Sequence, residues 1–141
     1  MTKPIRILLV EDNPGDRDLI QDAFETSETA FDVSVAIDGA DAIEYLLKRG
    51  THSDAETPDL IVLDLNMPKM DGRQVLTEIK KHDSVKSVPV VVFTSSDAEA
   101  DVAQSYALGA NCYVTKPVDL VAFQAVVKSI EEFWFTVAKL P

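Results

Sequence analysis

The sequence is short of basic residues, cysteine and long apolar runs, and each shortage excludes a class of protein. It has 13 Lys and Arg against 24 Asp and Glu, a formal net charge of −11 that argues against nonspecific binding to nucleic acid or anionic lipid. Cys112 is the single cysteine, which excludes an intramolecular disulfide and a cysteine-rich metal site. No apolar run approaches the roughly 20 residues of a membrane-spanning helix. We therefore expect a cytoplasmic protein that binds neither nucleic acid nor membrane.

The remaining composition is that of an ordinary globular protein. Hydrophobic residues make up 46% of the chain and charged residues 26%. A length of 141 residues suits one domain with a substantial core. We therefore expect a single domain over 1–141, with one principal site.

Short apolar segments alternate with amphipathic patterns along the chain. The segments with strand character are 5–10, 31–37, 60–63, 90–93 and 112–114. Helical spacing follows each of them, at about 14–24, 42–47, 75–81, 98–108 and 120–138. This alternation predicts an α/β fold, with a parallel sheet that is covered by helices on both faces.

Reactive side chains stand directly after four of the expected strands. These are Glu11 and Asp12 after the first, Asp64 after the third, Thr94 after the fourth and Lys116 after the fifth. The carboxyl ends of parallel strands share one edge of the sheet, where ligands bind. Three carboxylates at one edge repel one another unless a cation compensates them, and Mg²⁺ is the natural choice. Such a set favours phosphoryl transfer to a carboxylate, Asp64.

Each of these residues also has a purely structural interpretation. Glu11 and Asp12 could favour the dipole of the first helix, Thr94 could cap a helix, and Lys116 could be a surface charge. Their joint placement at one sheet edge favours the functional interpretation.

Over 5–127 the chain resembles the receiver domains of two-component response regulators. The motifs that carry the resemblance are LLVEDN, DLNMPKMDG, the Thr94–Ser95 step and the Lys116–Pro117 pair. The resemblance implies a flavodoxin-like (βα)5 fold, a doubly wound parallel sheet with strand order 2-1-3-4-5. It also implies a phosphorelay function, in which Asp64 accepts a phosphoryl group from a histidine kinase. Such a protein is no enzyme beyond its own Mg²⁺-dependent phosphorylation and dephosphorylation.

The resemblance also implies a metal site. Asp12 and Asp64 would bind Mg²⁺ through their carboxylates and Asn66 through its backbone carbonyl, while Glu11 would act mainly through water. Gly72 matches the turn that leads into the third helix, where we expect it to adopt an unusual backbone angle.

A second group of residues would bind the phosphoryl group and report its presence. Thr94 and Lys116 would hold the phosphoryl oxygens, and Ser95 is small enough to leave the approach open. Tyr113 would turn inward when Thr94 moves, although it could instead merely cover the edge of the fifth strand. We also expect a cis peptide bond before Pro117.

Two features resemble the single-domain regulators that pair with bacterial and cyanobacterial phytochromes. They are the long connection 49–58 and the tail 130–141, and they make a phytochrome-type kinase a candidate partner. Phe133, Trp134 and Phe135 are consecutive, so they cannot all face one core. We expect them to form a homodimer contact, the alternative being that Phe133 and Trp134 pack on their own domain. Without an output domain after the last helix, we expect signalling by protein contacts.

Three other functions remain as alternatives. An aspartyl-phosphate phosphohydrolase would carry a second acid two residues after its nucleophile, where this chain has Asn66. A flavodoxin-like nucleotide carrier would have a phosphate loop where Glu11 and Asp12 stand. A pseudo-receiver that no longer accepts phosphate, acting as a dimeric interaction module, is opposed by the intact set of site residues.

Overall fold

The computed structural model describes residues 4–27, 29–67, 70–95, 98–117 and 119–132. Strands and helices alternate through these residues as the sequence predicts. The strands are β1 (Ile5–Val10), β2 (Phe31–Ala36), β3 (Leu60–Leu63), β4 (Val90–Thr94) and β5 (Cys112–Thr115). The helices are α1 (Pro14–Glu25), α2 (Gly39–Leu46), α3 (Gly72–Lys81), α4 (Glu99–Ala107) and α5 (Leu120–Ile130), with a short 3₁₀ turn, η1 (Gly50–His52), after α2.

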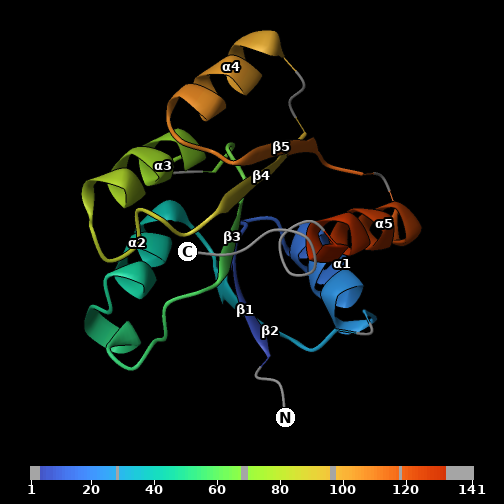
Figure 1. The fold of residues 1–141 in the computed structure, drawn as a ribbon, viewed down its shortest axis with the longest axis horizontal. Helices are drawn as coiled ribbons and strands as arrows, with labels where there is room; N and C mark the ends of the chain where they lie inside the picture. The colour runs from blue at the N-terminus through green and yellow to red at the C-terminus, as the bar shows by residue number, and fades with distance from the viewer. Residues whose placement is uncertain (1–3, 28, 68–69, 96–97, 118, 133–141) are drawn as a thin grey trace.

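The five strands form one parallel sheet in the order β2-β1-β3-β4-β5 (Figure 1). Val10 pairs with both Ala36 of β2 and Leu63 of β3, so the carboxyl ends of these three strands lie level. The predicted flavodoxin-like fold and strand order are therefore confirmed.

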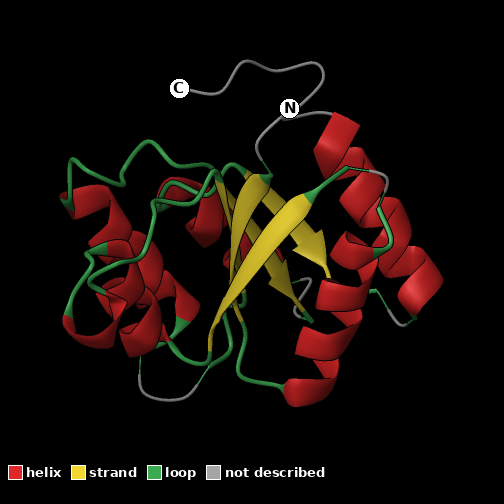
Figure 2. Ribbon diagram, turned by 90° about the horizontal axis from the view of Figure 1, so that it is seen from below, coloured by secondary structure: helices red, strands yellow, loops and turns green. Residues whose placement is uncertain are grey.

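The sheet is buried on both faces, as Figure 2 shows with helices on either side of the strands. In β1, Leu8 and Val10 pack on the side of α2 and α3, whereas Ile7 and Leu9 pack on the side of α1 and α5. Because successive side chains of a strand point to opposite faces, a strand covered on both sides must be apolar throughout. This explains the continuous apolar runs in the sequence.

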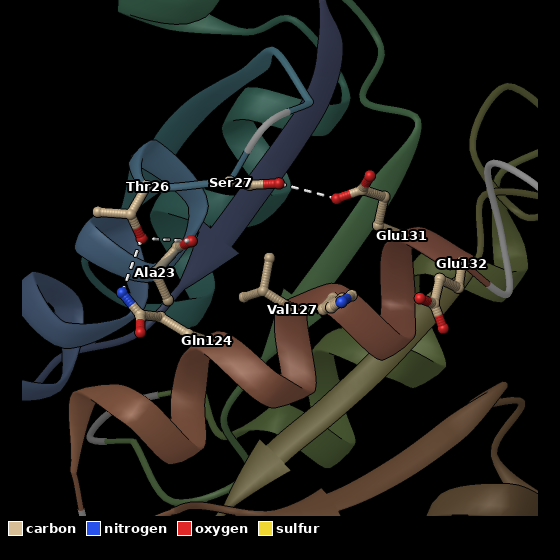
Figure 3. Close-up of a pocket in the computed structure, with 8 residues that line it drawn as sticks. Ala23, Thr26, Ser27, Gln124, Val127, Glu131 and Glu132 are labelled. Atoms are coloured by element: carbon tan, nitrogen blue, oxygen red, sulfur yellow. Dashed lines mark hydrogen bonds between the residues drawn. The ribbon is translucent and has the colours of Figure 1, made fainter.

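Helices α1 and α5 also contact each other along a polar seam (Figure 3). Gln124 Nε2 donates to Thr26 Oγ1 at 3.0 Å, and Ser27 Oγ donates to Glu131 Oε2 at 2.8 Å. Beneath this seam, Phe123 of α5 is fully buried. The two hydrogen bonds link the end of α1 to α5.

Two helices begin earlier than the sequence pattern predicts. Helix α2 begins three residues before Ala42 because Asp38 caps it, its side chain accepting a hydrogen bond of 2.8 Å from Asp41 N. Helix α3 begins three residues before Val75, directly after its N-cap Asp71. Helix α5 is described as Leu120–Ile130, and both its expected continuation over 133–138 and the expected dimer contacts Phe133, Trp134 and Phe135 lie outside the described residues. Within the described ranges, no helix has the length and apolar character to cross a membrane.

Candidate functional site

Three of the predicted carboxylates meet at the carboxyl edge of the sheet. Glu11, Asp12 and Asp64 each offer an oxygen atom, and these oxygens all lie within 4.8 Å of one another. They meet because β1 and β3 are neighbours and end level, so the residues after Val10 and Leu63 are adjacent. Glu11 and Asp64 are only 1% and 4% exposed, so the three negative charges are concentrated in a poorly hydrated place.

Asp64 is oriented through both carboxylate oxygens. Its Oδ1 accepts a hydrogen bond of 3.1 Å from the backbone N–H of Asn66, and its Oδ2 accepts one of 3.1 Å from Lys116 Nζ. Its own N–H donates to the carbonyl of Val10. The structure therefore holds the Asp64 carboxylate in one orientation at the end of β3.

Lys116 is the cationic partner of this cluster. Its Nζ lies 2.6 Å from Glu11 Oε1, 2.7 Å from Asp16 Oδ2 and 3.1 Å from Asp64 Oδ2. Burial alone lowers the pKa of Lys116, but its interactions with the carboxylates of Asp16, Glu11 and Asp64 outweigh it and raise the pKa above its ordinary value. Lys116 is thus a permanent ammonium group at neutral pH, and Asp16 is a partner that the sequence analysis did not identify.

Glu11 is the carboxylate whose charged form burial disfavours most clearly. Burial raises its pKa to about 7, against the opposing effect of Lys116 and with a further contribution from the charge of Asp64. Its Oε2 accepts a hydrogen bond from Asn13 N, whereas its buried Oε1 has no well-aligned donor among the described residues, in spite of its ion pair with Lys116. Glu11 Oε1 is thus a buried acceptor without a well-aligned donor in the described part of the chain, and it lies beside two further carboxylates. This arrangement suits the binding of a hard divalent cation, which prefers oxygen ligands.

The backbone of the acidic pair is held by Arg17, one turn into α1. Arg17 Nη1 donates to the carbonyls of Glu11 and Asp12, at 3.2 Å and 3.0 Å. Helix α1 begins as predicted, since Asn13 is its N-cap and Pro14 stands at its first position. The sequence signal for Arg17 is weak, because one basic residue in a first helical turn has no specific meaning by itself.

Thr94 and Asn66 lie beside Asp64 from the neighbouring strand and loop. Thr94 is buried at the end of β4, and its Oγ1 accepts a hydrogen bond of 3.2 Å from Asn66 Nδ2. Ser95, the next residue, is exposed, and its expected role in leaving the approach open stays a prediction. The expected metal contact of the Asn66 carbonyl stays a prediction.

Tyr113 is partly buried and packs against the core on the side of α2 and α3. Its N–H donates to the hydroxyl of Tyr106 at 3.1 Å, which ties β5 to α4. The expected inward turn of Tyr113 when Thr94 moves stays a prediction.

Two expectations about the backbone are wrong. The described residues contain no cis peptide bond, so the bond before Pro117 is trans. The two isomers of an X–Pro bond differ by only about 0.5–1 kcal/mol, which a sequence pattern does not resolve. Positive φ occurs at Gly50 and Gly109 but not at Gly72. Gly72 instead allows a close approach, because a Cβ there would lie 2.4 Å from the carbonyl oxygen of Asp64.

Comparison with known proteins agrees with this geometry. The family model of the response regulator receiver domain matches residues 7–128. Response regulator Rcp1 of Synechocystis sp. is 44% identical over 138 residues, which cover 98% of this chain and 94% of Rcp1.

Two of the solved structures that resemble this chain are those of response regulators. The phosphorylated cyanobacterial phytochrome response regulator RcpA is 47% identical, with a TM-score of 0.92 over 99% of both chains. The Mn²⁺-bound form of Rcp1 is 43% identical, with a TM-score of 0.88 over 98% of this chain and 99% of that one. This chain therefore belongs to the response regulator receiver domain family.

Proposed function

We propose that this protein is the phosphoacceptor of a two-component system, in which Asp64 takes a phosphoryl group from a histidine kinase. The observation that carries this proposal is the Asp64 carboxylate, held by Asn66 N on one oxygen and Lys116 Nζ on the other. Phosphoryl transfer needs positioning and neutralisation of charge rather than elaborate covalent chemistry, and these contacts supply both.

In the proposed reaction, a carboxylate oxygen of Asp64 forms a bond to phosphorus. The bond between phosphorus and the kinase imidazole nitrogen breaks, its electron pair stays on that nitrogen, and the nitrogen takes a proton from water. We propose that Lys116, whose Nζ is 3.1 Å from Asp64 Oδ2, and the hydroxyl of Thr94 donate to the oxygens of the arriving group. We propose no turnover by this protein beyond its own phosphorylation and dephosphorylation.

We further propose that Glu11, Asp12 and Asp64, with the backbone carbonyl of Asn66, hold Mg²⁺. The oxygen donors and the poorly satisfied Glu11 Oε1 support a hard divalent cation, and the similar protein Rcp1 has been solved in a Mn²⁺-bound form. When bound, such a cation neutralises the negative charge that gathers around the phosphoryl group.

The proposed partners are a phytochrome-type histidine kinase and a second copy of this chain. Similarity to the cyanobacterial phytochrome response regulator RcpA supports the first. The second rests on the consecutive aromatic residues Phe133, Trp134 and Phe135. Replacing Phe133 and Trp134 with alanine lowers the mass in sedimentation equilibrium if the tail forms the dimer, and an unchanged mass contradicts it.

Phosphorylation is tested by incubating the protein with a small acyl phosphate and Mg²⁺, then measuring intact mass. We expect one added phosphoryl group in wild type and none in Asp64→Asn or in the presence of EDTA. Absence of the addition in wild type, together with failure to bind beryllofluoride, would favour the pseudo-receiver. Continuous release of phosphate from a phosphomonoester substrate would favour the phosphohydrolase.

A further inference from the structure

Three carboxylates surround the ammonium group of Lys116. Its Nζ donates hydrogen bonds to Asp16 and Asp64 and forms an ion pair with Glu11, at 2.6–3.1 Å. A phosphoryl group on Asp64 brings additional oxygen atoms next to the same ammonium group. These oxygens compete with the three carboxylates for Lys116, so we expect at least one carboxylate to lose its contact.

Asp16 is the partner that is released at the lowest cost. Its side chain is 32% exposed, against 1% for Glu11 and 5% for Asp64, so water can replace the lost hydrogen bond. Glu11 and Asp64 belong to the cluster of three carboxylates, whereas Asp16 does not. When Asp16 loses its contact with Lys116, no unpaired charge is therefore added to the buried cluster.

The position of Asp16 is fixed by the start of α1. Its backbone N–H donates to Asn13 Oδ1 at 3.0 Å, the capping contact of the helix. The Asp16 carboxylate, which is partly exposed, accepts from Lys116 Nζ at 2.7 Å, a distance typical of a charge-assisted hydrogen bond.

We propose that Asp16 is a positioning residue that occupies one donor of Lys116 in the unphosphorylated protein and releases it when the phosphoryl group arrives at Asp64. The inference rests on the proposed function of Asp64. It has a kinetic consequence, because the Asp16 carboxylate competes for Lys116 and also repels an anionic phosphoryl donor. Asp16 thereby slows phosphorylation.

The test compares three variants in the rate of phosphorylation by a small acyl phosphate with Mg²⁺. Asp16→Asn keeps the size of the side chain and removes its charge, and we expect the rate to rise roughly threefold to tenfold. Asp16→Glu restores a carboxylate that reaches Lys116, so its rate returns close to that of wild type. Asp18→Asn removes the same charge from the exposed face of α1, and its rate stays at that of wild type.

A second measurement examines the contact in metal-free protein, without any phosphorylation. Acylation of Lys116 by an acid anhydride, mapped by peptide mass spectrometry, reports the reactivity of its amine. We expect Asp16→Asn to increase labelling of Lys116, because the exposed side of the ammonium group loses its partner, while Asp18→Asn and Asp16→Glu leave the labelling unchanged. Equal labelling in wild type and Asp16→Asn would overturn the proposed contact.

The two hypotheses fail in different ways. If wild type neither takes up a phosphoryl group nor binds beryllofluoride, the proposed function is wrong and this inference is overturned with it. If wild type is phosphorylated and Asp16→Asn reacts at the same rate or more slowly, only the role of Asp16 is overturned.

Discussion

The side-chain amide of Asn66 donates a hydrogen bond of 3.2 Å to the hydroxyl of Thr94, joining the loop after β3 to the end of β4. Asn66 is exposed and Thr94 is fully buried, so water can replace Thr94 as the partner of the amide. The hydroxyl only accepts in this contact, so we expect its own O–H to donate to a phosphoryl oxygen at Asp64.

Replacement of Thr94 by valine tests this expectation. Thr94→Val keeps the shape and removes the hydroxyl, so we expect phosphorylation by an acyl phosphate to slow by about tenfold or more, the effect of one hydrogen bond to a charged group. Thr77→Val, which removes an exposed hydroxyl of α3, is the control and keeps the wild-type rate. An unchanged rate in Thr94→Val would show that the hydroxyl does not contact the reacting group.

Gly72 is expected to be intolerant of any side chain. In Gly72→Ala the new Cβ would lie 2.4 Å from Asp64 O and 2.7 Å from Leu65 Cα, so the backbone that carries Asp64 has to move. We expect a loss of about 1–3 kcal/mol in the free energy of unfolding, measured with urea, and slower phosphorylation.

The matched control is Gly15→Ala in the first turn of α1. There the Cβ lies 3.3 Å from Asn13 Oδ1, a side-chain atom and not backbone, and the expected change is less than about 1 kcal/mol. Equal stabilities of Gly72→Ala and wild type would contradict the close approach.

Phe123 links α5 to the sheet. It is fully buried, and its ring meets that of Phe93 edge to face with centroids 5.7 Å apart. Phe123→Ala should lower the free energy of unfolding by about 3–5 kcal/mol in a urea titration followed by far-ultraviolet circular dichroism. Val121→Ala, at a position 74% exposed on the same helix, should change it by less than about 0.5 kcal/mol.

Glu11 gives the metal-free protein a defined pH dependence. Its pKa is raised from 4.5 to about 7, so the folded state binds the proton more tightly than the unfolded state does. The stabilisation from this proton is complete below about pH 4.5 and is lost as the pH rises through 7.

The Glu11→Gln side chain does not titrate, so this variant does not lose stability from deprotonation at position 11. In EDTA, its free energy of unfolding should gain on that of wild type as the pH rises from 4.5 to 7. Glu25→Gln, on an exposed part of α1, controls for the removal of one negative charge. If both variants follow the same pH dependence, the burial of Glu11 is not its cause.

The alternation of strands and helices followed from local features of the sequence, whereas the strand order came from the resemblance to receiver domains. Apolar runs such as 60–63 are typical of strands buried on both faces, and a parallel sheet then places Asp64 on the same edge as Glu11 and Asp12. These inferences need no knowledge of side-chain packing, which is why they were accessible.

The missed features depend on tertiary contacts. Asp16 looks like an ordinary acidic residue in a first helical turn, and only the position of β5 brings Lys116 to it. In the same way, the contact of Tyr106 with Tyr113 requires the placement of α4 on β5. For Gly72, the pattern indicated that glycine was needed but did not distinguish an unusual backbone angle from a close approach.

We expect Asp64, and no other carboxylate of the site, to accept the phosphoryl group. Reduction of the acyl phosphate with borohydride converts the modified aspartate to homoserine, which peptide mass spectrometry locates. We predict homoserine at position 64 in protein treated with an acyl phosphate and Mg²⁺, and at no other position. Homoserine at Asp12 or Asp16, or its absence from a protein that has gained phosphoryl mass, would contradict the proposed role of Asp64.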